Sequence, residues 1–127
     1  FNKEDLFETH HLENESFNGK STLLETKNNT IALNYTLFEK DALVFKQLNS
    51  NEVTLKNKDK VILKVNYDHF PYLGIWTKEN APFLCIEPWC GLADSSNHNG
   101  NFEEKEGINY LSAGEDFLRA MRIEILE

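Results

Sequence analysis

Apolar and polar residues alternate along most of the chain, and this period of two restricts the fold more than any other feature. The runs "TIALNYTLF" and "KVILKVNYD" are clear examples. Alternation with β-branched and aromatic residues is typical of strands that bury one face. We therefore expect strands at residues 22–26, 30–38, 42–48, 52–57, 60–68, 72–78, 83–89 and 116–126.

Turn residues separate these runs at intervals of roughly ten residues, which predicts an antiparallel β-sandwich. The predicted turns lie at Asn18-Gly19, Asn57 to Asp59, Asn80 to Pro82 and Ala113-Gly114. The run at 116–126 also has the composition of a helix, but its apolar residues share strand parity, which favours a strand. With 127 residues, the chain is expected to form a single all-β domain, residues 1–127, with a core of its own.

The charge of the chain argues against two classes of partner. The formal net charge is −8, and nucleic acids and anionic membranes are bound through clustered Lys and Arg. We therefore expect neither partner, whereas a neutral small molecule is compatible with this charge. No apolar run is long enough to span a bilayer and no leader peptide is visible, so we expect a cytoplasmic protein. Cys85 and Cys90 are too few for a disulfide scaffold and are expected as small buried side chains.

Glu87 is an acidic residue inside the most apolar stretch, "FLCIEPW" at 83–89. In a strand, Phe83, Cys85 and Glu87 share one face. Pro88 cannot donate to a sheet, so pairing should weaken there and leave Glu87 at the rim. A carboxylate beside aromatic rings loses hydration and becomes a stronger base. From local sequence alone, either a catalytic base or a strand-end ion pair explains this residue.

A long polar segment, "GLADSSNHNGNFEEKEG" at 91–107, follows this acid directly. It has no apolar period and is rich in Gly and Asn, so we expect a long loop. Loops of this length in compact domains are usually functional or mobile.

Two motifs carry a resemblance to a known family. "YLGIWTKENAPFLCIEPWCGLAD" at 72–94 and "EEKEGINYLSAGEDF" at 103–117 resemble the C-terminal part of the aldose 1-epimerase (galactose mutarotase) family. The similarity is strongest to its bacterial lactose-utilisation branch and extends more weakly through "LFEKDALVF" at 37–45. The resemblance implies the antiparallel β-sandwich of the galactose mutarotase (supersandwich) type, with this chain as its C-terminal portion.

The resemblance also implies a reaction and roles for individual residues. The reaction is the interconversion of the α and β anomers of a free aldose such as galactose or glucose, with no cofactor or metal. Glu87 would be the general base. Asp41 would bind a sugar hydroxyl and Trp76 would contact the sugar, with Trp89 a weaker candidate for such a contact. Asp94 and Lys105 are expected to hold the loop rather than the substrate.

The family pattern is incomplete here, because its general acid is a histidine of the N-terminal half. The histidines of this chain are His10, His11, His69 and His98, and none lies in the matching motif. We expect the first three on the surface or in structural roles, and His98 as the one that could lean over the site. The N-terminal half of the same protein is therefore an expected partner, and the chain alone is expected to be inactive.

Two other functions are compatible with the sequence. One is a non-catalytic sugar-binding or regulatory β-sandwich. The other is an epimerase of phosphorylated hexoses, which predicts an arginine cluster for the phosphate. The chain contains only Arg119 and Arg122, which argues against the phosphorylated substrate.

Overall fold

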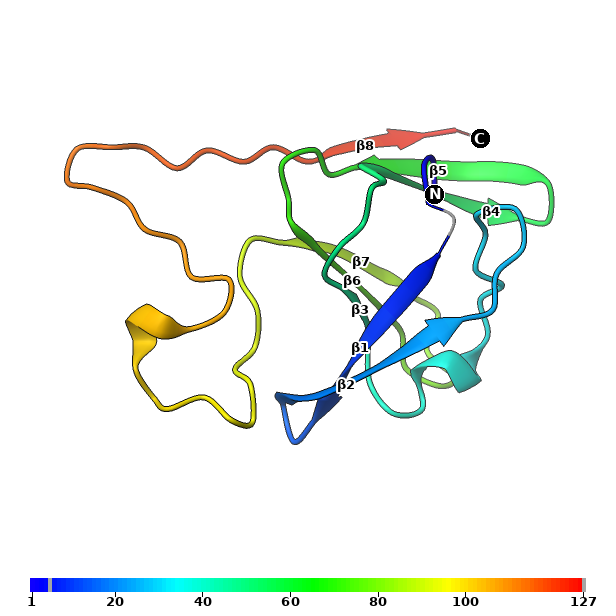
Figure 1. Cartoon of the computed structure of the whole chain (residues 1–127). Coiled ribbons are helices and arrows are strands. Elements are labelled where there is room, and N and C mark those ends of the chain that lie inside the picture. The colour runs from blue at the N-terminus through cyan, green and yellow to red at the C-terminus, as the bar shows by residue number, and fades with distance from the viewer. Residues whose placement is uncertain (5, 127) are drawn as a thin grey trace.

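The computed structural model describes residues 1–4 and 6–126, and its regular elements are strands apart from two short 3₁₀ helices (Figure 1). The elements are β1 Phe7–Glu13, β2 Ser16–Leu24, the 3₁₀ helix η1 Tyr35–Phe38, β3 Leu43–Phe45, β4 Glu52–Asn57, β5 Lys60–Asn66, β6 Tyr72–Trp76, β7 Cys85–Trp89, the 3₁₀ helix η2 Phe102–Glu104 and β8 Arg122–Ile125.

The strands form two antiparallel sheets, which confirms the predicted all-β sandwich. Five strands form one sheet in the order β2-β1-β3-β6-β7, and three form the other in the order β4-β5-β8. The main core lies between them, because its buried residues come from both sheets. Phe7, Phe45 and Leu73 of the larger sheet are at most 1% exposed, and Val53 and Val65 of the smaller sheet join the same cluster.

The opposite face of the five-stranded sheet has a smaller apolar cluster of its own. Val44 and Phe17 are its most buried members, and Tyr72 and Trp89 pack against them. This second face is the one that carries Glu87, because Val44, Gly74 and Glu87 lie opposite one another on β3, β6 and β7. The larger sheet therefore separates the sandwich core from the candidate site.

The predicted strand at 30–38 is wrong. Its one recorded pairing is an isolated bridge between Lys27 and Thr30, and the segment ends in η1. Asn34 explains part of the difference, because its side-chain oxygen accepts the backbone N–H of Leu37 at 3.2 Å. This bond caps the short helix, and such local bonds by Asn compete with sheet pairing.

The predicted turn at Asn18-Gly19 is also wrong, because both residues lie inside β2. The hairpin turn is Asn14-Glu15, with φ values of 50° and 63°, as a two-residue turn between antiparallel strands requires. Leu12 pairs with Phe17 whereas His10 pairs with Ser21, so β2 carries extra residues opposite β1. Gly19, with φ of 75°, supplies the left-handed conformation that this bulge needs.

The predicted strand at 116–126 is only partly observed, because β8 begins at Arg122. The segment before it runs away from the sheets as an extended chain (Figure 1). It exposes several large apolar side chains: Tyr110, Leu111, Phe117, Leu118 and Met121. The alternation is present there, but no strand of the described residues lies beside it.

The N-terminal residues are held by a buried carboxylate. Glu4 is 3% exposed, and its Oε2 accepts the backbone N–H groups of Asn49 and Ser50, each at 2.9 Å. Its Oε1 accepts the Asn49 side-chain amide at 3.3 Å. The contact joins residues far apart in sequence and fixes the turn between β3 and β4.

We expect Glu4→Ala to lower the free energy of unfolding by about 2–3 kcal/mol, because two buried N–H groups lose their acceptor. Glu4→Gln should cost about 1 kcal/mol or less, since its amide oxygen still accepts both backbone N–H groups and only the longer bond from the Asn49 side chain is lost. Urea denaturation followed by circular dichroism measures the difference. Equal losses in the two variants would contradict this account of Glu4.

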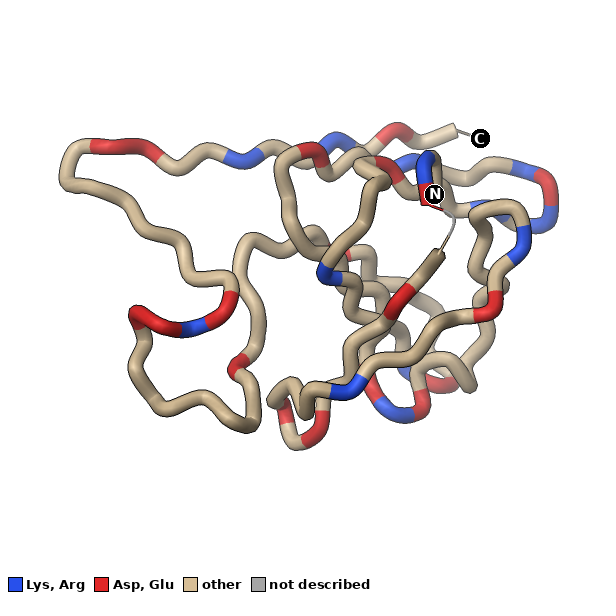
Figure 2. Tube along the Cα trace, in the orientation of Figure 1, with Lys and Arg blue, Asp and Glu red and all other residues tan. Residues whose placement is uncertain are grey.

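No helix in the described part of the chain is long and apolar enough to cross a bilayer. Acidic and basic residues are mixed along the trace and separated by stretches without charge (Figure 2). The absence of nucleic-acid and membrane partners stays a prediction.

Candidate functional site

Glu87 lies near the end of β7, at the edge of the five-stranded sheet. It pairs with Gly74 of β6, and its side chain is half-buried. Pairing continues through Pro88, opposite Leu73, to Trp89, so the expected break at Pro88 is wrong. The reason is that β7 is an edge strand, where a proline without an N–H group is tolerated.

Two indole groups hold the Glu87 carboxylate. Trp76 Nε1 donates to Oε1 at 2.7 Å, and Trp89 Nε1 donates to Oε2 at 3.2 Å. Within the described residues, no Lys or Arg lies at ion-pair distance from Glu87, so the strand-end ion pair is not what the structure shows. A carboxylate has about four lone-pair sites, so acceptor capacity remains for a ligand.

The Trp89 indole reaches Glu87 by lying across the neighbouring strand. A Cβ atom at Gly74 would be 2.5 Å from Trp89 Cζ2 and 2.9 Å from Cη2, so the ring occupies the space above this glycine. Trp76 approaches from β6, on the diagonal of the Gly74–Glu87 pair. Phe83 packs edge-on against Trp76, with ring centroids 5.4 Å apart.

Cys85 is the third polar neighbour of Glu87. Partial burial raises the pKa of its thiol, and the charge and hydrogen bonding of Glu87 raise it further. A thiol with a raised pKa stays protonated near neutral pH and donates rather than attacks. Cys85 and Cys90 are both half-buried and unpaired, rather than fully buried as expected.

Asp41 makes its hydrogen bond within its own turn rather than with Glu87. It is exposed on the turn before β3, where its Oδ1 accepts the backbone N–H of Ala42 at 2.6 Å. It lines a depression of about 740 Å³ together with His10 and His11, on the β1–β2 side of the sheet. The structure thus joins Trp76 to Glu87 by a hydrogen bond, whereas the hydrogen bond of Asp41 is to Ala42. A sugar contact of Asp41 or Trp76 stays a prediction.

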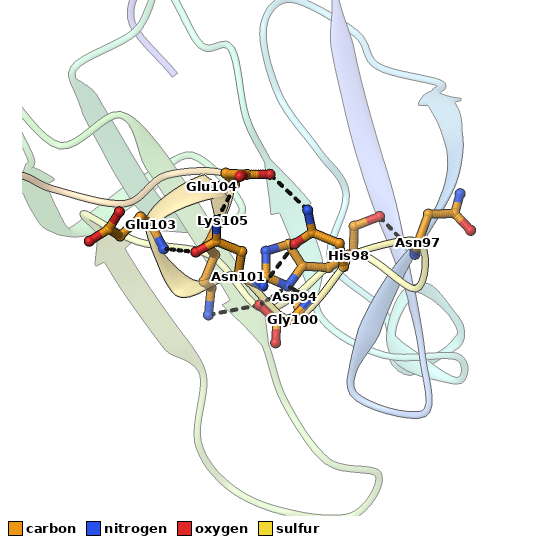
Figure 3. Close-up of polar contacts among 10 residues, drawn as sticks. Asp94, Asn97, His98, Gly100, Asn101, Glu103, Glu104 and Lys105 are labelled. Carbon is orange, nitrogen blue, oxygen red and sulfur yellow. Dashed lines mark hydrogen bonds and ion pairs between the residues drawn. The ribbon is translucent and has the colours of Figure 1, made fainter.

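The loop at 91–107 is folded onto itself (Figure 3). Lys105 Nζ lies 3.2 Å from Asp94 Oδ1, which confirms that this pair holds the loop. Glu104 accepts the side-chain amides of Asn99 at 2.7 Å and Asn101 at 2.6 Å, and these bonds lower its pKa. The loop also joins β2, because Phe17 N–H donates to the Asp94 carbonyl at 2.8 Å.

The histidines take structural or exposed positions. His98 Nδ1 accepts the backbone N–H of Gly100 at 3.2 Å, inside the folded loop. His11 bonds the Thr22 hydroxyl at 2.8 Å, and the His69 side chain is 80% exposed. His10 lies on the Glu87 face, opposite Val44, and burial, followed by the charge of Lys46, lowers its pKa. None of the contacts recorded for these histidines involves Glu87.

A shallow depression of about 680 Å³ begins where β7 ends. Its lining runs from Pro88 through Ala93 and returns through Phe102, Lys105 and Gly107 to Asn109. Glu87 is not part of this lining, but it immediately precedes it in the strand. Among the described residues, no group of three or more His, Cys, Asp or Glu side chains is arranged to hold a metal ion.

Gly74 escaped the sequence reasoning, and Trp89 was considered only as a weaker candidate for sugar contact. Gly74 interrupts the apolar run "YLGIW", and an isolated glycine inside a strand often marks a close approach of another group. Trp89 follows Glu87 by two residues and therefore shares its face in a strand. These signals mark both residues, but the register that places Gly74 opposite Glu87 is a long-range property.

Comparison with known proteins adds relatives at the level of sequence. Two proteins, LacX encoded on the chromosome and LacX encoded on a plasmid of Lactococcus lactis subsp. lactis, are 37% identical over 81 residues. The match covers 62% of this chain but only 27% of each relative. No protein-family model matches the chain.

A solved structure is similar to this chain in fold as well as in sequence. The X-ray structure of a galactose mutarotase related enzyme from Lactobacillus acidophilus superposes with a TM-score of 0.84 at 30% identity. The superposition covers 96% of this chain and 42% of that one, so the chain spans less than half of its structural neighbour. The resemblance to the galactose mutarotase family, as one portion of a longer fold, is thereby confirmed.

Proposed function

We propose that this chain, which resembles galactose mutarotase-related proteins in sequence and fold, carries the general base of an aldose 1-epimerase. The observation that supports this most directly is the Glu87 carboxylate, held by two indole N–H groups at the sheet edge. No cofactor or metal enters the proposal. A cytoplasmic location is part of it, because the substrate would be a free sugar of carbohydrate metabolism.

The proposed reaction needs one base and one acid on opposite sides of the sugar ring. Glu87 takes the proton from the anomeric hydroxyl while an acid protonates the ring oxygen, and the bond between C1 and the ring oxygen breaks. The open-chain aldehyde turns about the C1–C2 bond. The hydroxyl then adds back to the other face of the carbonyl, and both protons return, so the step is balanced and reversible.

The general acid is proposed to come from a histidine outside this chain, in an N-terminal half of the same protein. The match to only part of longer relatives supports this arrangement, and so does the lack of a recorded contact between Glu87 and the described histidines. Asp41 and Trp76 are proposed to bind the sugar, either galactose or glucose, once the site is complete.

A non-catalytic sugar-binding sandwich is the second candidate. What favours it is that Glu87 lines neither the depression next to the end of β7 nor the one beside β1 and β2. A phosphorylated hexose fits less well, because Arg119 lies before β8 and contacts Phe117 and Leu118, away from Glu87.

Polarimetry of freshly dissolved α-galactose and α-glucose tests the proposal. We expect the 127-residue chain to leave the rate at that of buffer, and the protein expressed with any upstream coding sequence to accelerate it. Sugar binding by the longer protein without acceleration would favour the non-catalytic candidate instead.

A further inference from the structure

We infer that Trp76 and Trp89 are positioning residues that hold the Glu87 carboxylate, and that Gly74 is the strand position that admits the Trp89 indole. This inference deepens the proposed function and rests on it, because it assigns roles around the same carboxylate. It goes beyond the sequence prediction for Trp76, which concerned contact with the sugar.

The two donors approach from different strands, and this fixes the side chain. Trp76 is on β6 and Trp89 is on β7, and each takes a different oxygen of Glu87. A glutamate side chain loses considerable rotamer freedom when it is held. Because these bonds restrict it before a substrate arrives, the carboxylate is pre-organised for proton transfer.

The chemistry of the donors matches a carboxylate side chain. An indole N–H group donates and does not accept, so two of them facing one side chain require two acceptor oxygens. Glu87 offers one oxygen to each indole. A glutamine offers one oxygen, and its NH₂ group would face the other indole N–H. The pair of donors therefore fits a glutamate at this position better than a glutamine.

Gly74 is required for steric reasons and not for its backbone conformation. It is absent from the glycines with positive φ in the described chain, which are Gly19, Gly100, Gly107 and Gly114. A Cβ there would meet three ring atoms of Trp89 within 3.0 Å. The indole is rigid and packs against the second apolar cluster, so an alanine would push it away from Glu87.

We call the two indole groups and the Glu87 carboxylate that they hold the clamp. Nuclear magnetic resonance tests the clamp directly, because the chain has only two tryptophans. The ¹⁵N-labelled full chain gives two indole N–H signals, which Trp76→Phe and Trp89→Phe assign. We expect Glu87→Gln to move both signals, because the indole N–H groups no longer each face a carboxylate oxygen. Glu79→Gln, on an exposed residue, should move neither signal. Signals that do not respond to Glu87→Gln would overturn the inference.

Gly74→Ala tests the steric part. We expect it to remove the Glu87 dependence of the Trp89 signal and to keep that of the Trp76 signal. Gly91→Ala is the matched control, because its added Cβ would meet only a backbone oxygen, at 3.9 Å. A Trp89 signal that stays unchanged in Gly74→Ala would overturn the role of Gly74. If this variant does not fold, the Trp89→Phe spectrum still tests the clamp.

Kinetics separate positioning from general structural damage. In a catalytically active protein, Gly74→Ala should lower kcat by about 10- to 10²-fold with little change in KM, since the base is misplaced. An unchanged kcat, or a loss that falls on KM instead, would overturn the positioning role. The resonance experiment needs no catalysis, so its outcome is distinct from a failed mutarotation assay.

Discussion

Glu87→Gln is expected to lower the rate of anomer exchange by about 10²- to 10⁴-fold in a protein that holds both proton-transfer groups. The amide has no lone pair basic enough to take the anomeric proton. It also offers one oxygen to two indole donors, so one of the bonds at 2.7 and 3.2 Å is lost. Polarimetry at several sugar concentrations measures the loss, which should fall mainly on kcat.

Two variants control this experiment. Glu79→Gln makes the same chemical change on the exposed connection between β6 and β7 and should keep the full rate. Glu87→Asp keeps the charge but is shorter by one methylene, so it should reach only one indole and retain an intermediate rate. Full activity in Glu87→Gln would remove Glu87 from the chemistry, even if the sugar still binds.

The face and the rim position of Glu87 were predictable from the sequence because they follow from local rules. A period of two places Glu87 with Cys85 and Trp89, and the polar segment after Trp89 places them at a strand end. The pairing of Glu87 with Gly74 was not predictable in this way. Register is a long-range property, set by which faces bury together, and one sequence does not contain it locally.

The predicted strands that the structure does not contain show the same limit of local sequence rules. Residues 30–38 and 116–121 alternate as well as residues 52–57 do, yet only the last became a strand over the predicted range. Alternation predicts that a segment can pair and bury one face, but a neighbouring strand must be present. Residues 30–38 have no such neighbour, and Asn34 caps a short helix instead.

The positions of Trp76, Asp41 and Trp89 differ in how far they follow from local sequence. Trp76 reached Glu87 because β6 and β7 are joined by a short connection, which brings sequence neighbours into register. Asp41 lies on a turn outside the regular pairing, so no parity rule fixes its direction. The Trp89 indole was harder to foresee, because its position depends on the missing side chain of Gly74.

Phe45→Ala should produce the largest loss of stability, about 3–5 kcal/mol, because it removes a ring from the centre of the main core. Phe45 is 1% exposed, and its ring lies 6.2 Å from that of Phe7 and 5.9 Å from that of Phe1. The loss combines lost burial with the cavity left behind. For a domain stabilised by about 5–15 kcal/mol, it is a large fraction of the total.

Phe102→Ala is the matched control for this prediction, since it removes the same ring from a position that is 70% exposed. It should change the free energy of unfolding by about 0.5 kcal/mol or less. Urea unfolding of the two variants then separates burial from residue type, and the midpoint for Phe45→Ala should fall by at least about 1 M. Similar midpoints for both variants would mean that the two sheets do not enclose the core between them. The packing that supports the five-stranded sheet beneath Glu87 would then be described wrongly.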